Sequence, residues 1–186
     1  MKTIKQLFFF SVLILLSVTF AFGQNETPKL PIDNSTGKIA YSGIVMVKDS
    51  ASKDELFKRA KICFVHLFKS SNSVIQNEDK EAGTIIGKGI IKVSVRTVTM
   101  ILEGGYINFT LTIVTKEGRY KYTCTDFVHE GTLYLPSVGN LENDRPRKWR
   151  EKWWNSVLSQ TDTEIQSTIS SMKLEMNRPS PQNEKW

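Results

Sequence analysis

Two runs of alternating side chains joined by a short turn constrain the fold of this chain most. Apolar side chains occupy every second position over residues 107–113. After Glu117-Gly118 the chain returns with the same alternation over residues 120–124 and again at Val128. A period of two places one kind of side chain on each face of a strand. A glycine-containing turn between two such runs predicts an antiparallel hairpin with one apolar and one polar face.

Further segments favour strands that extend this hairpin into a sheet. Residues 39–47 and 84–95 alternate in the same way, and residues 73–77 form a shorter strand candidate. Gly87 and Gly89 fall on the apolar face of the second segment, where they would allow a large side chain to pack closely. Further along, residues 96–102 are β-prone, and Gly104-Gly105 is expected to end that stretch.

Two segments have helical periodicity. Ser52 and Glu55 form a capping box that predicts a helix start, and this helix is expected to end near Ser70. Its apolar stripe comprises Leu56, Ala60, Cys63, Phe64 and Leu67, with Lys53, Lys58, Arg59, Lys61 and Lys69 largely outside it. A second helix is predicted from Arg147 to about Asn177, with an apolar stripe of Trp154, Val157, Leu158, Thr161, Ile165, Ile169, Met172 and Met176.

The order of elements is therefore strand, helix, four strands, helix. Strands with one polar face and two amphipathic helices can close a core only if both helices cover the apolar face of an antiparallel sheet. The sequence predicts an α+β domain with this arrangement, whose second sheet face is open to water.

The N-terminus has the three parts of a secretory signal peptide. Lys2 and Lys5 precede the apolar run Leu7–Phe22, and the small residues Ala21 and Gly23 suit cleavage before residue 24. An uncleaved anchor is the alternative, although the run is shorter than the roughly 20 residues that span a bilayer. Cleavage would lower the formal net charge from +6 to +4.

The predicted organisation is a signal peptide (1–23), a flexible lead-in (24–38), a single domain (39–176) and a disordered tail (177–186). No transmembrane span is expected after cleavage. The expected location is the periplasm or cell envelope of a Gram-negative bacterium, or the medium outside it.

Four stretches resemble the family called domain of unknown function 4468, which comprises exported bacterial proteins with a TBP-like fold. They are residues 41–47, 54–60 (DELFKRA), 69–89 (KSSNSVIQNEDKEAGTIIGKG) and 118–130 (GRYKYTCTDFVHE). The resemblance covers most of residues 31–176 and implies a TBP-like β-α-β4-α layout, with two helices on one face of the sheet. It implies no activity, so it transfers no catalytic residue, and fold alone does not define function.

The residue inventory argues against an enzyme. His66 lies near Phe64 and Leu67 in the first helix, where a partly buried or surface histidine is the favoured interpretation, because catalysis or metal binding needs partners placed around it. His129-Glu130 lacks the second histidine of a zinc protease. Strand geometry is expected to place Cys124 and Asp126 on one face and His129 on the other, which separates a thiol from its base. No metal or cofactor site is predicted. The alternative is a hydrolase that uses acids, Ser or Thr in an unrecognised site.

The two cysteines, Cys63 and Cys124, both fall on predicted core faces. An oxidising compartment would permit a disulfide, provided that the two Cα atoms approach within about 7 Å. Two buried free thiols are the favoured interpretation.

Two surfaces are candidates for binding a ligand or partner. The first is the open sheet face, a basic and hydroxyl-rich surface comprising Lys88, Lys92, Asn108, Thr110, Thr112, Arg119, Lys121, Thr123 and Thr125. The second is a basic and aromatic patch at the start of the last helix, comprising Arg147, Trp149, Arg150 and Trp153. The alternatives are a solvated sheet face and tryptophans buried on the sheet.

The predicted function is that of an exported, non-enzymatic domain that binds an envelope ligand or partner protein. Weak contact with anionic surfaces is compatible with the net charge. Nucleic acid is not expected as a partner, because the open face lacks the apolar wedges that DNA-binding relatives of a TBP-like fold insert between bases.

Overall fold

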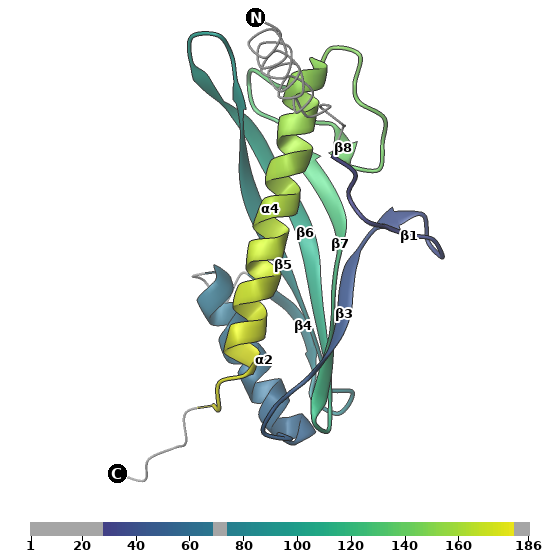
Figure 1. Ribbon diagram of the computed structural model, residues 1–186, viewed down its shortest axis with the longest axis vertical. Helices are drawn as coiled ribbons and strands as arrows, with labels where there is room; N and C mark the ends of the chain where they lie inside the picture. The colour runs from purple at the N-terminus through teal and green to yellow at the C-terminus, as the bar shows by residue number, and fades with distance from the viewer. Residues whose placement is uncertain (1–27, 69–73, 181–186) are drawn as a thin grey trace, which may run out of the picture.

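The computed structural model describes residues 28–68 and 74–180 (Figure 1). The predicted signal peptide, the first four residues of the predicted lead-in and residues 181–186 of the predicted tail lie outside the described residues.

A single antiparallel sheet forms the body of the domain, with strand order β3-β7-β6-β5-β4 and the short β8 paired to β7. The elements are β1 (Ile32–Asp33), β2 (Lys38–Ile39), β3 (Tyr41–Met46), α2 (Lys53–Phe68), β4 (Ile75–Asp79), β5 (Thr84–Arg96), β6 (Ile101–Lys116), β7 (Arg119–Glu130), β8 (Gly139–Asn140) and α4 (Glu151–Met176). The predicted order of strand, helix, four strands and helix is confirmed by β3, α2, β4 to β7 and α4.

Both helices pack on the same face of the sheet (Figure 1). From α2, Phe68 lies against Phe109 of β6, with ring centroids 6.2 Å apart. From α4, Asp162 accepts a hydrogen bond of 2.7 Å from the Tyr41 hydroxyl of β3. All eight residues of the predicted α4 stripe are buried. The predicted fold class, an α+β sheet with two helices, is therefore confirmed.

Gly87 shows why one helix can approach the sheet so closely. A Cβ atom added to Gly87 would lie 2.5 Å from Cε1 of Phe64 and 2.9 Å from the carbonyl oxygen of Val74. Since real Cβ atoms do not tolerate such distances, the missing side chain on β5 is what lets the Phe64 ring of α2 settle on the sheet.

The expected break at Gly104-Gly105 is wrong: β6 continues through both residues. The register shifts opposite Val93 and Ser94, and Gly105 adopts a φ of 106°. This is a β-bulge, in which one extra residue bends the strand without ending its pairing.

A second bulge corrects the predicted faces of β7. Two residues, Asp126 and Phe127, stand opposite one residue of β6, and Asp126 has a φ of 56°. The alternation reverses at this point, so Cys124, Phe127 and His129 are all buried beneath the helices while Asp126 is exposed. The prediction that Cys124 and His129 point to opposite faces is wrong for this reason.

Parts of the predicted lead-in and tail make specific contacts where they are described. Asp33 accepts hydrogen bonds from the backbone and hydroxyl of Ser35, and this turn joins β1 to β2 as a two-stranded ribbon. Leu30 is buried. At the other end of the chain, Ser180 is hydrogen-bonded to Glu55 of α2.

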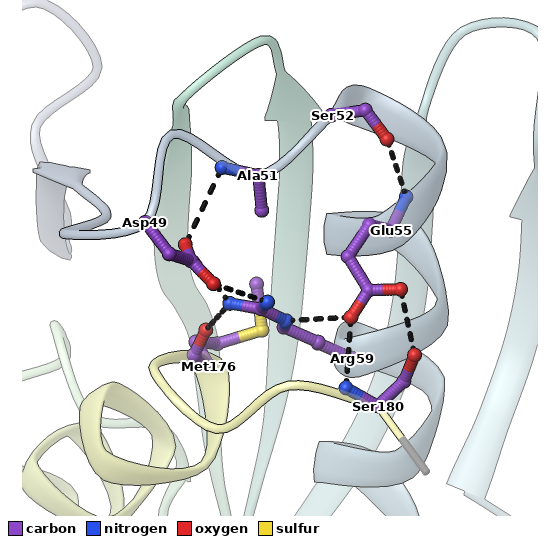
Figure 2. A network of polar contacts seen from close by, with 7 residues as sticks. All are labelled: Asp49, Ala51, Ser52, Glu55, Arg59, Met176 and Ser180. Atoms are coloured by element: carbon purple, nitrogen blue, oxygen red, sulfur yellow. Dashed lines mark hydrogen bonds and ion pairs between the residues drawn. The ribbon is translucent and has the colours of Figure 1, made fainter. Parts of the chain in front are cut away.

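A buried arginine links the start of α2 to the end of α4 (Figure 2). The Arg59 side chain is only 3% exposed, although the helical pattern placed it outside the apolar stripe. Its guanidinium lies 2.9 Å from Glu55 and 2.5 Å from Asp49, and it donates to the carbonyl oxygen of Met176 at 3.3 Å. The last carbonyls of a helix carry partial negative charge, so a cation there is favourable.

Only half of the predicted capping box forms. The Glu55 backbone N–H donates to the Ser52 hydroxyl at 3.2 Å, as predicted, but the Glu55 carboxylate binds Arg59 and Ser180 instead of completing the box (Figure 2). Burial would raise the pKa of Glu55, but hydrogen bonds from Ser180 and Arg59 outweigh it and leave that pKa lowered.

Candidate functional site

The sheet face opposite the helices gathers the residues predicted for the first binding surface. The strand register aligns this open face in cross-strand rows: Met46–Arg119–Lys116, Ile44–Lys121–Val114–Thr84, Ser42–Thr123–Thr112–Ile86, Thr125–Thr110–Lys88, Val128–Asn108–Ile90 and Glu130–Tyr106–Lys92. All nine residues of the predicted open face lie in these rows. Threonines of β6 and β7 stand opposite each other at its centre beside Lys88, and the other cations lie toward both ends.

The cations of the open face differ in their neighbours. Lys92 pairs with Glu103 at 2.9 Å, and Lys88 donates to the Thr110 hydroxyl at 2.9 Å. Within residues 28–68 and 74–180, no carboxylate lies within ion-pair distance of Lys88, Arg119 or Lys121. Positive charge is therefore left without internal compensation on the part of the face nearest the β6–β7 turn.

The open face is more apolar than the sequence pattern predicted. Ile44, Met46 and Ile90 are all exposed large side chains on this face. A shallow hollow of about 290 Å³ lies between Ile44 and Val114, and it is bordered by Lys116, Arg119, Tyr120 and Lys121. A sequence signal existed, because apolar residues in β3 occupy both alternating sets of positions.

The second predicted surface does not form as one patch. Trp149 is 2% exposed and packs edge-on against His129 and Trp154, so it belongs to the core. The helix α4 begins at Glu151, not at the predicted Arg147, and Arg150 before it is extended. Trp153 remains partly exposed, with Arg150 stacked 5.2 Å above its ring, and Arg147 is exposed.

The buried His129 has a structural role. Its Nδ1 accepts the Val138 backbone N–H at 3.2 Å, which leaves Nε2 to donate to the Gly104 carbonyl oxygen at 2.8 Å. Burial lowers the pKa of His129 and favours the neutral ring. The second histidine, His66, is exposed on α2 and lies 2.9 Å from Glu175.

Both cysteines are free and buried. Burial raises the pKa of Cys63 and of Cys124 to about 12, so neither thiol forms a nucleophilic thiolate near neutral pH. The disulfide left open by the sequence is not formed.

The described part of the chain holds neither a metal-binding cluster nor a membrane-spanning helix. Over these residues, no three His, Cys, Asp or Glu side chains are arranged to hold a metal ion. No helix among the described elements has the length and apolar character needed to cross a bilayer.

Comparison with solved structures defines the class of this protein as a TBP-like α+β domain. A crystal structure of a DUF4468 family protein from Bacteroides ovatus ATCC 8483 superposes with a TM-score of 0.63 and 13% identity, covering 82% of this chain and 93% of that one. A crystal structure of a TBP-like protein from Parabacteroides distasonis ATCC 8503 superposes with a TM-score of 0.55 and 17% identity, covering 77% and 96%.

A family profile also matches the sequence. The profile of the family described as "Domain of unknown function (DUF4468) with TBP-like fold" matches residues 41–130 of this chain. The matched region runs from the first residue of β3 to the last residue of β7. No curated protein matches the sequence at a significant level.

Proposed function

We propose that this protein is an exported, non-enzymatic binding domain, and that the open face of its sheet takes an acidic partner protein. The observation that carries this proposal is the group of cations without carboxylate partners among the described residues, Lys88, Arg119 and Lys121, beside the exposed Ile44 and Met46. An acidic surface with apolar side chains complements both features at once.

The size of the face supports a macromolecular partner. The rows from Tyr106 to Lys116 cover ten steps along β6, or about 34 Å, and four strands span about 19 Å. The resulting area of about 650 Å² approaches the roughly 800 Å² that each partner buries in a standard protein interface. A small metabolite would occupy only a fraction of it.

The chemistry of the face supports binding over hydrolysis. A hydrolytic site needs a nucleophile within reach of a base, in a pocket that excludes water. The hydroxyls of Thr110, Thr112 and Thr123 lie in cross-strand rows on an open sheet face, while His129 is in the core and His66 is on α2.

Export is supported by the sequence of the N-terminus. Lys2 and Lys5, the apolar run Leu7–Phe22 and the small residues Ala21 and Gly23 form the pattern that signal peptidase recognises. N-terminal sequencing of the protein recovered from its natural cell tests this part of the proposal. A start at Gln24 would support export, and a retained Met1 on a cytoplasmic protein would contradict it.

The binding proposal can be tested with peptide probes and isotope-labelled protein. A peptide of alternating Glu and Leu is titrated into the ¹⁵N-labelled protein, with a Lys and Leu peptide as the charge-reversed probe. We expect saturable shifts confined to amides of β3, β5, β6 and β7 for the acidic peptide only. Shifts that cluster elsewhere, or equal responses to both peptides, would contradict the proposal.

Matched variants connect the peptide response to the open face. Lys88→Glu combined with Lys121→Glu should weaken acidic-peptide binding about fivefold or more, because two attractive charges become repulsive. Lys58→Glu, an exposed cation on α2, should change it less than twofold. Equal effects from the two sets of variants would indicate nonspecific charge attraction and would refute the site.

A further inference from the structure

One end of the molecule exposes large apolar side chains on two neighbouring loops. The tip between β5 and β6 carries Val98, which is 99% exposed, together with exposed Met100 and Ile101. The loop after β7 carries Leu133, 94% exposed, and the exposed Tyr134. This end lies beyond the first turns of α4, at the pole opposite the β6–β7 turn (Figure 1).

A hydrogen bond brings the two apolar loops together. The Thr132 hydroxyl lies 3.5 Å from the carbonyl oxygen of Glu103, two residues beyond the exposed Ile101 on β6. Apolar loop tips of this kind are costly in water, because each isolated side chain stays hydrated and contributes nothing to the core.

Cations and a tryptophan flank the apolar loops. The Trp153 indole N–H donates to the Arg96 carbonyl oxygen at 3.2 Å, two residues before Val98, and Arg150 stacks on the same indole ring. Lys152 is also exposed, and over the described residues no carboxylate lies within ion-pair distance of Arg96, Arg150 or Lys152. Tryptophan and basic residues beside exposed apolar side chains are typical of surfaces that lie in the headgroup region of a bilayer.

The N-terminal part of the chain joins the domain at the same end. Pro28, the first described residue, lines a shallow hollow of about 720 Å³ together with Arg96, Lys152 and Trp153. In the sequence, five residues separate the apolar run Leu7–Phe22 from Pro28, a reach of about 20 Å in an extended chain. Whenever that apolar run is in a membrane, this end of the domain is the part nearest to it.

We infer that this end, defined by Arg96, Val98, Ile101, Leu133, Arg150 and Trp153, docks on the surface of an anionic lipid bilayer. The apolar tips enter the headgroup region, and the cations contact lipid phosphates. The inference does not depend on the open sheet face. That face reaches the docking end only at the loop between β5 and β6.

The test uses the mature chain that begins at Gln24 and asks which end contacts lipid. An environment-sensitive fluorophore is placed at Val98→Cys, or at Glu117→Cys in the β6–β7 turn as the matched control at the opposite pole. The native thiols are buried and stay unlabelled. On phosphatidylglycerol vesicles with brominated acyl chains, quenching at position 98 should exceed that at position 117 at least fivefold.

Lipid charge and side-chain variants complete the test. Quenching at position 98 should fall severalfold on phosphatidylcholine vesicles, since the cations lose their lipid partners. Ile101→Asp, at a side chain that is 63% exposed, should reduce it about tenfold. Ile32→Asp, at an isoleucine that is 50% exposed in the β1–β2 ribbon, should leave it unchanged.

The same mature chain is used in every variant, so the position of the label is what differs. Quenching at position 98 that does not exceed that at position 117, or that is the same on both lipids, overturns the inference.

Discussion

Replacing Arg59 with methionine is expected to destabilise the domain by about 2–3 kcal/mol. Removing one member of a buried ion pair costs about 3–5 kcal/mol, since its partner loses compensation. Methionine retains the apolar stem and much of the volume, so cavity formation adds little. Both carboxylates beside Arg59 keep some contact with water and can be rehydrated, which places the expected loss at or below the lower end of that range.

This change is measured by urea unfolding at pH 7, followed by tryptophan fluorescence because Trp149 and Trp154 are buried. A loss of 2–3 kcal/mol corresponds to a fall of roughly 4–12 °C in Tm for a domain of this size. Lys58→Met removes a neighbouring exposed cation and should change stability by less than about 0.5 kcal/mol. If both variants unfold at the same urea concentration, the guanidinium network contributes nothing and the reasoning fails.

Three further predictions concern packing, pH and thiol chemistry. Gly87→Ala should cost about 1–3 kcal/mol in urea unfolding, because the new Cβ overlaps the Phe64 ring, and an unchanged midpoint would contradict this. The lowered pKa of Glu55 adds stability that is complete above its unfolded pKa of about 4.3 and is lost as the pH falls through its lower folded pKa. Arg59→Met should therefore lose less stability than the natural chain between pH 5 and pH 3, and equal losses in both proteins would argue against the linkage. Cys63 and Cys124 should resist a disulfide reagent at pH 8 until urea unfolds the chain, whereas labelling of the native protein within seconds would show that they are accessible.

Local patterns in the sequence were sufficient to predict most of the fold. The residues of α4 that face the core recur with the helical period, and the same positions are buried in the structure. The β6–β7 hairpin was predictable for the same reason, because alternation and the Glu117-Gly118 turn are contained within one short stretch. Signals of this kind depend only on neighbours along the chain.

Features that depend on distant partners were not predictable. The bulges at Gly105 and Asp126 change the register of one strand against another, and the side-chain pattern of a single strand does not show how it pairs with its neighbour. Arg59 lies outside the apolar stripe of α2 by periodicity, and it is buried only because Asp49 and the Met176 carbonyl reach it from elsewhere. The side-chain pattern of one strand or one helix does not reveal its contacts with distant parts of the chain.

The sequence predicted which polar residues share the candidate binding face, but it did not predict the exposed apolar side chains on that face. Lys88, Thr110 and Lys121 share one face because strict alternation holds on both sides of the hairpin. The exposed Ile44 and Met46 were not predicted. The strand β3 carries apolar side chains on both faces, but only the face that includes Val45 was predicted to be apolar.

The contact between Arg59 and Met176 sets an order for biosynthesis. A ribosome delivers residue 59 long before residue 176, and until then this cation has only carboxylates near it in sequence and no helix end to meet. A chain that ends before Met176 therefore leaves this contact of Arg59 unmade.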